Sequence, residues 1–260
     1  MTTNNHASNC VLASRCTLAN SKACSFQCPH FIATNSRLRA SGVPADYRLV
    51  MVANSPARAE QSKVYKSVDA YVKTFERQFE DVSTQLPEAQ RRIKSLYLYS
   101  ESPGTGKTTT ASAILNEYLT QHYIGCLQRS RQALQQPAYF LDVNAWQSLF
   151  NEFNRSNIPA DIGEEASRQY YRQMQAAKTA PFAVLDDIGV RQASEAFRGD
   201  LHAVINARVT AGLPTVYTSN LPLAEMERVF DARLYDRMRD QCAELVFAGK
   251  SQRGMRNNGR

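Results

Sequence analysis

A glycine-rich segment near the middle of the chain ends in a lysine and a threonine, a combination that can bind phosphate. The segment ESPGTGKTTT follows an apolar run, and Glu101 stands where the usual pattern begins with glycine. Glycines let backbone N–H groups face phosphate oxygens, the lysine pairs with the β and γ phosphates, and the threonine hydroxyl binds Mg²⁺. An ordinary glycine turn at a helix start is the alternative. We expect nucleotide contacts from Pro103, Gly104, Thr105, Gly106, Lys107, Thr108 and Thr109.

Two carboxylates follow a second apolar run, PFAVLDD. Phosphate-transferring sites of this kind hold Mg²⁺ with one acid and orient or deprotonate the attacking water with another group. We assign the metal-binding role to Asp186, acting through water, and the water-activating role to Asp187. The alternative is a pair of acids that caps the next helix.

Two further polar groups complete the candidate site. Asn220 follows the apolar run LPTVYTS, and ligands of parallel sheets lie at the carboxyl ends of strands, which would place its side chain beside the γ phosphate. A Ser-Asn turn before Pro222 is the alternative. The segment FDARLYDRMRD carries Arg233, Arg237 and Arg239 on an expected helix, where an arginine can reach the phosphates of a neighbouring subunit. A solvated basic helix face is the competing interpretation.

Cysteines are concentrated at the N-terminal end. Cys10, Cys16, Cys24, Cys28 and His30 are enough to bind one tetrahedral Zn²⁺ with one ligand to spare, although no paired CxxC motif is present. Disulfides are disfavoured in a reducing compartment. Free thiols and an iron–sulfur cluster are also compatible with these residues.

Short apolar runs alternate with helical patterns in the rest of the chain, which predicts an α/β fold with a parallel sheet covered by helices. The five expected strands are KSLYLYS, PAYFLDV, PFAVLDD, LPTVYTS and AELVFAG. Helices are expected near 64–79, 107–122, 144–154, 163–178 and 192–211. Trp146, Phe150 and Phe153 recur at helical spacing, which favours a core position over a base-stacking platform.

Composition divides the chain into four parts. Residues 1–45 contain few large apolar side chains, so we expect a small cysteine-rich module that needs a staple such as Zn²⁺. Residues 46–60 read as an extended connector, 61–250 as the main domain and 251–260 as a basic tail. The 260 residues carry a net charge of +7, which favours a polyanionic partner. No apolar run reaches the length of a membrane span or a signal-peptide core, so we expect a cytoplasmic protein without a membrane partner.

The ordered set PGTGKT, VLDDIG, VYTSN and LYDRM resembles the ATPase core of the DnaC and DnaI helicase loaders, which are related to DnaA within the AAA+ class. The resemblance covers about residues 40–248 and implies a P-loop NTPase of AAA+ type. It assigns the Walker A role to Lys107 and Thr108 and the Walker B role to Asp186 and Asp187. It also assigns the sensor 1 role to Asn220 and the arginine-finger role to Arg237.

The same resemblance implies a function. Such loaders bind Mg-ATP and single-stranded DNA, assemble with other copies and deliver a hexameric replicative helicase, and a zinc-binding N-terminal region of DnaI-type loaders docks on that helicase. Asp187 in place of the more usual glutamate suggests slow ATP hydrolysis that is stimulated by assembly. Two alternatives are a transposition helper ATPase of the IstB type and a helicase-binding adaptor or inhibitor that does not hydrolyse ATP. Related ATPases bind DNA between the Walker elements, where this chain has Arg129, Arg131, Arg155, Arg168 and Arg172.

Overall fold

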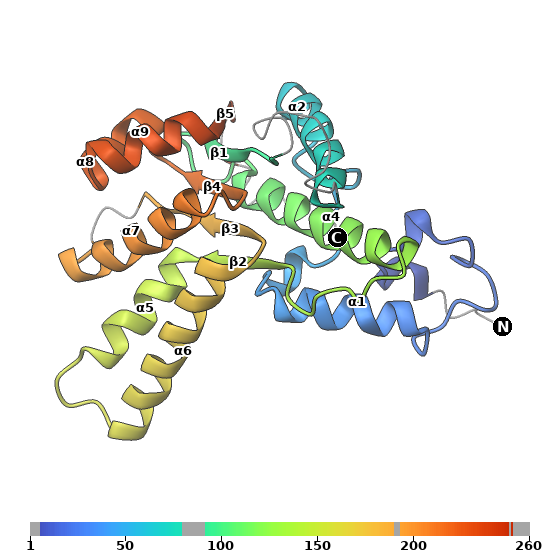
Figure 1. The fold of residues 1–260 in the computed structure, drawn as a ribbon, viewed down its shortest axis with the longest axis horizontal. Coiled ribbons are helices and arrows are strands. Elements are labelled where there is room, and N and C mark those ends of the chain that lie inside the picture. Colours follow the sequence, from blue (N-terminus) through green and yellow to red (C-terminus); the bar gives the residue numbers. More distant parts are fainter. Residues whose placement is uncertain (1–5, 80–91, 190–192, 250, 252–260) are drawn as a thin grey trace.

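The computed structural model describes residues 6–79, 92–189, 193–249 and 251. Its centre is a parallel sheet of five strands in the order β2-β3-β4-β1-β5 (Figure 1). All five expected strands are confirmed, with the bounds β1 Ser95–Tyr99, β2 Ala138–Asp142, β3 Phe182–Asp186, β4 Thr215–Ser219 and β5 Cys242–Val246.

The register of the sheet brings the polar strand ends together. Asp142 at the end of β2 pairs with Asp186 at the end of β3, and Tyr99 of β1 pairs with Ser219 of β4. Since all the strands are parallel, the segments that follow β1, β2, β3 and β4 leave the sheet at one edge. That edge contains the candidate site.

The two faces of the sheet contribute to two separate hydrophobic cores. Alternate side chains of a strand point to opposite faces, so Leu96 and Leu98 lie in one core while Tyr97 lies in the other. The first core is covered by α4 (Lys107–Gln128), α1 (Pro29–Ala40) and α2 (Ser62–Lys73), and the 3₁₀ helix η4 (Thr74–Phe79) continues from α2. The helix expected over 64–79 is therefore an α-helix that tightens into a 3₁₀ helix, and the helix after the glycine-rich loop is longer than expected.

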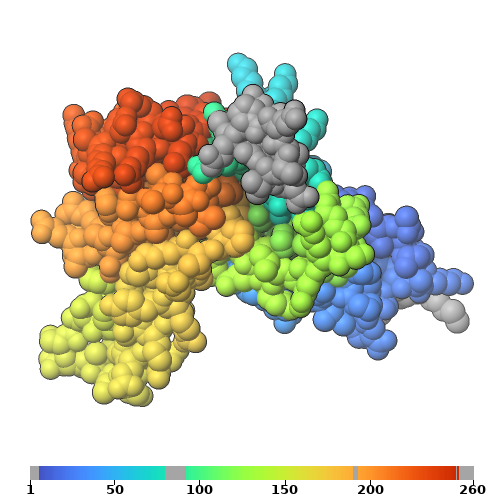
Figure 2. Space-filling view, in the orientation of Figure 1, coloured from blue at the N-terminus to red at the C-terminus, as the bar shows by residue number. Residues whose placement is uncertain are grey.

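The second core is covered by the remaining helices, which are α5 (Val143–Phe153), α6 (Ala160–Thr179), α7 (Glu195–Thr210), α8 (Met226–Val229) and α9 (Ala232–Gln241). Trp146 is fully buried and stacks on Tyr170 with the ring centres 4.6 Å apart. This burial supports the core interpretation of Trp146. The far ends of α5 and α6 form a hairpin that projects from the body of the molecule (Figure 2).

The N-terminal residues share a core with α4. Val11 and Leu12 are buried in the same cluster as the side chains of α4, and the Arg15 guanidinium lies 3.0 Å from the Glu117 carboxylate of that helix. The helix α1 was not expected, because its apolar residues are too few to form an amphipathic pattern, and it is stabilised by contacts with α4. The small number of apolar residues before residue 45 is thus offset by apolar surface from α4.

The segment 46–60 also packs on the body of the molecule. The segment begins within the 3₁₀ helix η3 (Ala45–Tyr47), and its side chains of Met51, Val52 and Ser55 are buried. Within the described residues, no helix is both long and apolar enough to cross a membrane. The expected basic tail lies outside the described residues except for Ser251.

Candidate nucleotide-binding site

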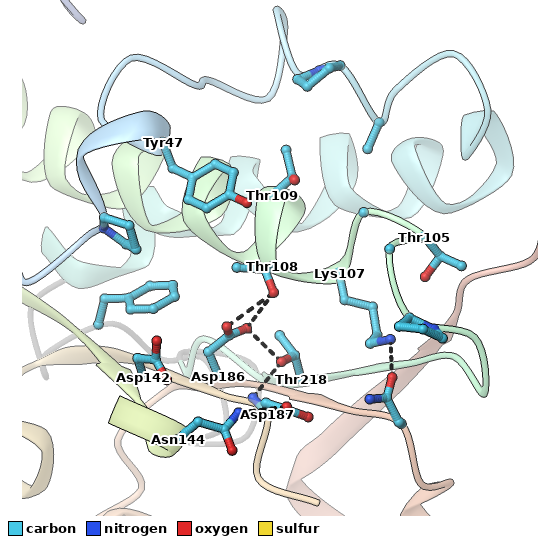
Figure 3. Close-up of a pocket in the computed structure, with 18 of the residues that line it drawn as sticks. Tyr47, Thr105, Lys107, Thr108, Thr109, Asp142, Asn144, Asp186, Asp187 and Thr218 are labelled. Atoms are coloured by element: carbon cyan, nitrogen blue, oxygen red, sulfur yellow. Dashed lines mark hydrogen bonds between the residues drawn. The ribbon is translucent and has the colours of Figure 1, made fainter. Parts of the chain in front are cut away.

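A cavity of about 720 Å³ lies at the carboxyl ends of the strands. Its floor is formed by the loop that follows β1, by the first turn of α4 and by the ends of β2, β3 and β4. Figure 3 shows the side chains of Lys107, Thr108, Asp186 and Asp187 in this space. The structure therefore brings together the phosphate-binding, metal-binding and water-activating residues that the sequence predicts.

The glycine-rich loop has a backbone that requires glycine. Gly104 and Gly106 have φ angles of 74° and 100°, in the left-handed region that L side chains rarely adopt. A Cβ atom on Gly106 would also lie only 2.6 Å from the Cβ atom of Ala57. The loop leads directly into α4, whose first N–H groups lack partners within the helix and attract anions. This arrangement fits a nucleotide phosphate chain.

Lys107 and Asn220 meet in the cavity. The Lys107 ammonium donates to the Asn220 amide oxygen at 2.6 Å and to the backbone carbonyls of Ser100 and Ser102 at 3.3 Å. Its side chain is largely buried, which holds the ammonium between the glycine-rich loop and the end of β4. Asn220 thus lines the cavity at the end of β4, and its role beside the γ phosphate stays a prediction.

Asp186 is held by two threonine hydroxyls. Thr108 Oγ1 donates to its carboxylate at 3.0 and 3.1 Å, and Thr218 Oγ1 donates to its Oδ1 at 2.7 Å. Oxygen ligands of this kind are those that Mg²⁺ prefers. The donor set of Thr108 and Asp186 therefore fits the expected Mg²⁺ site.

Burial raises the pKa of the Asp186 carboxyl to about 6. The hydrogen bonds from Thr218 and Thr108 oppose this rise, whereas the nearby carboxylates of Asp142 and Asp187 add to it. Asp186 is therefore ionised at neutral pH and takes up a proton in mildly acidic solution.

Asp187 has a strained backbone and a side-chain partner of its own. Its φ angle is 62°, which is uncommon for a residue other than glycine. Its backbone N–H donates to Thr218 Oγ1 at 2.8 Å, and Asn144 Nδ2 donates to its carboxylate at 2.8 Å. These contacts fix the direction of the carboxylate.

The sequence analysis missed Asn144 and Thr218. Asn144 lies two residues after the end of β2, and Thr218 is the second-to-last residue of β4, two positions before Asn220. The reasoning that identified Asn220, that polar groups at the carboxyl ends of parallel strands face the ligand, also applies to both.

The three arginines of α9 lie outside the cavity. Among the described residues none of them lines it. Arg237 donates to the Asn206 side-chain oxygen of α7 at 2.9 Å, and Arg239 pairs with Asp236 on its own helix. Arg233 is exposed. The prediction that these arginines lie on a helix is confirmed. Because they do not line the cavity of their own chain, any contact with nucleotide phosphates would be with those bound to a neighbouring copy.

The structure does not support the expected zinc site. Within the described part of the chain, no group of three or more His, Cys, Asp or Glu side chains is placed to hold a metal ion. His30 Nδ1 is 2.9 Å from the Tyr123 hydroxyl of α4. Burial raises the pKa of the Cys10 thiol, and three neighbouring thiols raise it further, those of Cys16, Cys28 and Cys24. These cysteines and His30 therefore do not form a metal-binding group in the described structure.

Solved structures with a similar fold include DnaI, a candidate primosome component and the DnaC helicase loader. DnaI is 19% identical over 84% of this chain and 100% of its own, with a TM-score of 0.53. A candidate primosome component from Streptococcus pyogenes serotype M3 is 18% identical over 84% of this chain and 98% of its own, with a TM-score of 0.53. The DnaC helicase loader is 18% identical over 79% of this chain and 100% of its own, with a TM-score of 0.51.

These likenesses confirm, at the level of the fold, the resemblance to DnaC- and DnaI-type loaders. The expected five-stranded parallel sheet with flanking helices is present, and its fold is shared with DnaI and the DnaC helicase loader. No protein-family model matches the chain. None of the curated proteins matches it in sequence.

The raised pKa of Asp186 predicts a pH dependence of Mg²⁺-dependent nucleotide binding. Below a pH of about 6 the carboxyl is protonated and no longer offers a negative charge to Mg²⁺. Affinity for Mg-ATP should therefore fall by about tenfold for each pH unit below this value, because one proton competes with one ion. Calorimetric titration across mildly acidic and neutral pH measures this fall.

Two variants serve as controls for this measurement. Asp186→Asn removes the titrating group, so its remaining pH dependence reports the protonation of ATP itself. Thr218→Val removes a hydrogen bond that lowers the pKa of Asp186, so the fall should begin at higher pH. Thr179→Val, at an exposed threonine of α6, should behave like the unaltered protein. An identical pH dependence in the Asp186→Asn variant and the unaltered protein would contradict the prediction.

Proposed function

We propose that this protein is a Mg²⁺- and ATP-dependent loader of a hexameric replicative helicase. One observation carries the proposal: Lys107, Thr108, Asp186, Asp187 and Asn220 converge on a single cavity. The fold around that cavity is shared with DnaI and with the DnaC helicase loader.

The cavity provides a group for each part of Mg-ATP. Lys107 and the glycine-rich loop would bind the β and γ phosphates, and Thr108 and Asp186 would hold Mg²⁺. Mg²⁺ held there would supply positive charge that offsets the negative charge of the phosphate oxygens during phosphoryl transfer. The Asn220 amide nitrogen would donate to the terminal phosphate, since its oxygen already accepts from Lys107.

Asp187 is the candidate that orients the attacking water. Its carboxylate accepts a hydrogen bond from Asn144, which fixes one of its oxygens and leaves the other to act on water. The short side chain reaches less far than glutamate, and we therefore propose slow hydrolysis that increases when copies of the protein assemble.

Single-stranded DNA is the proposed nucleic-acid partner, and the candidate arginines form two groups. Arg129 and Arg131 follow the end of α4. Arg155, Arg168 and Arg172 belong to the projecting α5–α6 hairpin. Arg168 and Arg172 both pair with Glu165. A net charge of +7 supports binding to a polyanion.

The N-terminal region is the proposed docking surface for the helicase. Residues 1–45 contain no acidic residue, and among them Leu18, Phe26 and Ile32 are all more than half exposed. Large exposed apolar side chains in a basic region are typical of a protein-binding surface. A transposition helper ATPase would share the nucleotide site but would prefer duplex DNA, and that preference distinguishes the two functions.

Lys107→Ala should abolish tight Mg-ATP binding while the fold remains intact, because the ammonium contacts the loop and Asn220 at the cavity. The same variant should fail to load a cognate replicative helicase onto circular single-stranded DNA. The measurements are ATP titration, thermal unfolding and a helicase-loading assay with the full chain.

Lys94→Ala is the matched control, since Lys94 is exposed and lies before β1, away from the cavity. It should bind ATP and load helicase as the unaltered protein does. ATP affinity that is unchanged by Lys107→Ala would refute the nucleotide site. Preference for duplex DNA together with failure to capture the helicase would instead support a transposition helper, and helicase capture without any ATP turnover would support an adaptor.

Arg237 is proposed to act on the ATP of a neighbouring copy. Arg237→Ala should bind ATP normally and lose the hydrolysis that assembly stimulates, by about a thousandfold if it matches known arginine fingers. Steady-state ATPase assays over a range of protein concentration measure the effect. Arg239→Ala is a control on the same helix, because Arg239 pairs with Asp236. An unchanged rate in Arg237→Ala would move the role to exposed Arg233.

A further inference from the structure

One wall of the cavity is formed by a segment to which the sequence analysis gave no ligand contact. Residues 43–61, here called the strap, pass over the glycine-rich loop and the start of α4. Five of its residues line the cavity, namely Pro44, Tyr47, Pro56, Ala57 and Glu60. The strap therefore faces the same ligand as Lys107 and Thr108 do.

The strap is clamped to α4 by Asn116. This asparagine is fully buried, and its side-chain NH₂ donates to the backbone carbonyls of Tyr47 at 2.8 Å and Val50 at 2.9 Å. A buried amide that serves main-chain carbonyls of a distant segment fixes the position of that segment. Asn116 thus sets where the backbone of Tyr47 lies relative to the helix that begins at Lys107.

Two further contacts hold the rest of the strap. Tyr65 of α2 shares its hydroxyl between Ser55 of the strap and Thr110 of α4. Gln61 donates to the carbonyl of Thr105 in the glycine-rich loop at 3.3 Å. Contacts at both ends and in the middle make the strap a fixed wall of the cavity.

The two ends of the cavity differ in chemistry. The end near β3 and β4 contains Lys107, Asp186 and Asp187, which suit phosphate and Mg²⁺. The strap side presents the rings of Pro44, Tyr47 and Pro56 and the carboxylate of Glu60, and Phe140 of β2 adds another ring. Figure 3 shows the Tyr47 ring directed into the cavity beside Thr108 and Thr109. A flat aromatic surface next to a phosphate site suits the base or ribose of a nucleotide.

We propose that Tyr47 forms the nucleoside-binding surface of the site and that Asn116 is the residue that positions it. The proposal rests on the proposed nucleotide-binding function and adds to it the group that distinguishes a nucleotide from a bare polyphosphate. Phosphate contacts alone would bind ATP and inorganic tripolyphosphate alike. The Tyr47 ring supplies affinity that only a ligand with a nucleoside can gain.

The experiment compares Mg-ATP with Mg-tripolyphosphate as ligands of the full chain. Tyr47→Ala should weaken ATP binding by about ten- to a hundredfold, the range expected for loss of one aromatic stacking partner, and should leave tripolyphosphate binding unchanged. Tyr47→Phe keeps the ring and should bind ATP within about twofold of the unaltered protein, since stacking does not need the hydroxyl. Tyr171→Ala is the matched control, because this tyrosine is 57% exposed on α6 and far from the cavity in sequence and fold.

Asn116→Leu tests the clamp with a side chain of similar size that cannot donate. It should weaken ATP binding in the same ligand-selective way as Tyr47→Ala, with tripolyphosphate affinity retained. Thermal unfolding identifies a variant that fails to fold, in which case the Tyr47 variants alone decide the question. Equal loss of both ligands in the folded Asn116→Leu protein would mean that the clamp supports the phosphate loop and would overturn its assigned role.

Several outcomes at Tyr47 overturn the proposal. ATP affinity unchanged in Tyr47→Ala, equal loss of ATP and tripolyphosphate, or loss in Tyr47→Phe as large as in Tyr47→Ala would each do so. Lys107→Ala, measured in parallel, separates this result from the failure of the proposed function. If Lys107→Ala abolishes binding of both ligands while Tyr47→Ala changes neither, the nucleotide site stands and the assignment of Tyr47 is wrong.

Discussion

The hydrogen bonds to the buried carboxylate of Asp186 constrain the rest of the site. A carboxylate removed from water is costly unless it accepts hydrogen bonds, and here the hydroxyls of Thr108 and Thr218 supply them. Thr108 belongs to the first turn of α4 and Thr218 to β4, so the Asp186 side chain at the end of β3 links the start of α4 to β4. The same hydroxyl of Thr218 accepts from the backbone of Asp187 and thereby fixes the second acid. The strand order places β4 between β1 and β3, which is what allows these three segments to meet.

The helix α4 extends this constraint to the N-terminal half of the molecule. It begins at Lys107 in the cavity, and its middle carries Asn116 against the strap and Glu117 against Arg15. Farther along, Tyr123 contacts His30 of α1. A single rigid element therefore contacts the glycine-rich loop, the strap and the cysteine-rich region.

Sequence patterns predicted those parts of the structure that depend on neighbouring residues. The five strands and the loop at Gly104 and Gly106 are local patterns of apolar residues and glycine, and the structure contains them. The helix α1 and the packed strap were not predicted, because they are stabilised by distant side chains of α4 that no local pattern reveals. Asn144 was missed for a related reason: a single asparagine after a strand acquires its role only when the sheet places it beside Asp187. The cysteine spacing predicted a metal site that the described residues do not form.

The N-terminal residues and α4 share one hydrophobic core, so the proposed docking region is not a separate module. A region of few apolar residues can dock a partner as an independent module only if it folds by itself, and Val11 and Leu12 are buried against α4 instead. The carboxylate of Glu117 is largely buried, and burial raises its pKa while Arg15 lowers it. Removing Arg15 from this contact leaves a buried carboxylate without its charged partner, which is costly. The proposed docking surface and the candidate nucleotide site are therefore parts of one folded body and share the helix α4.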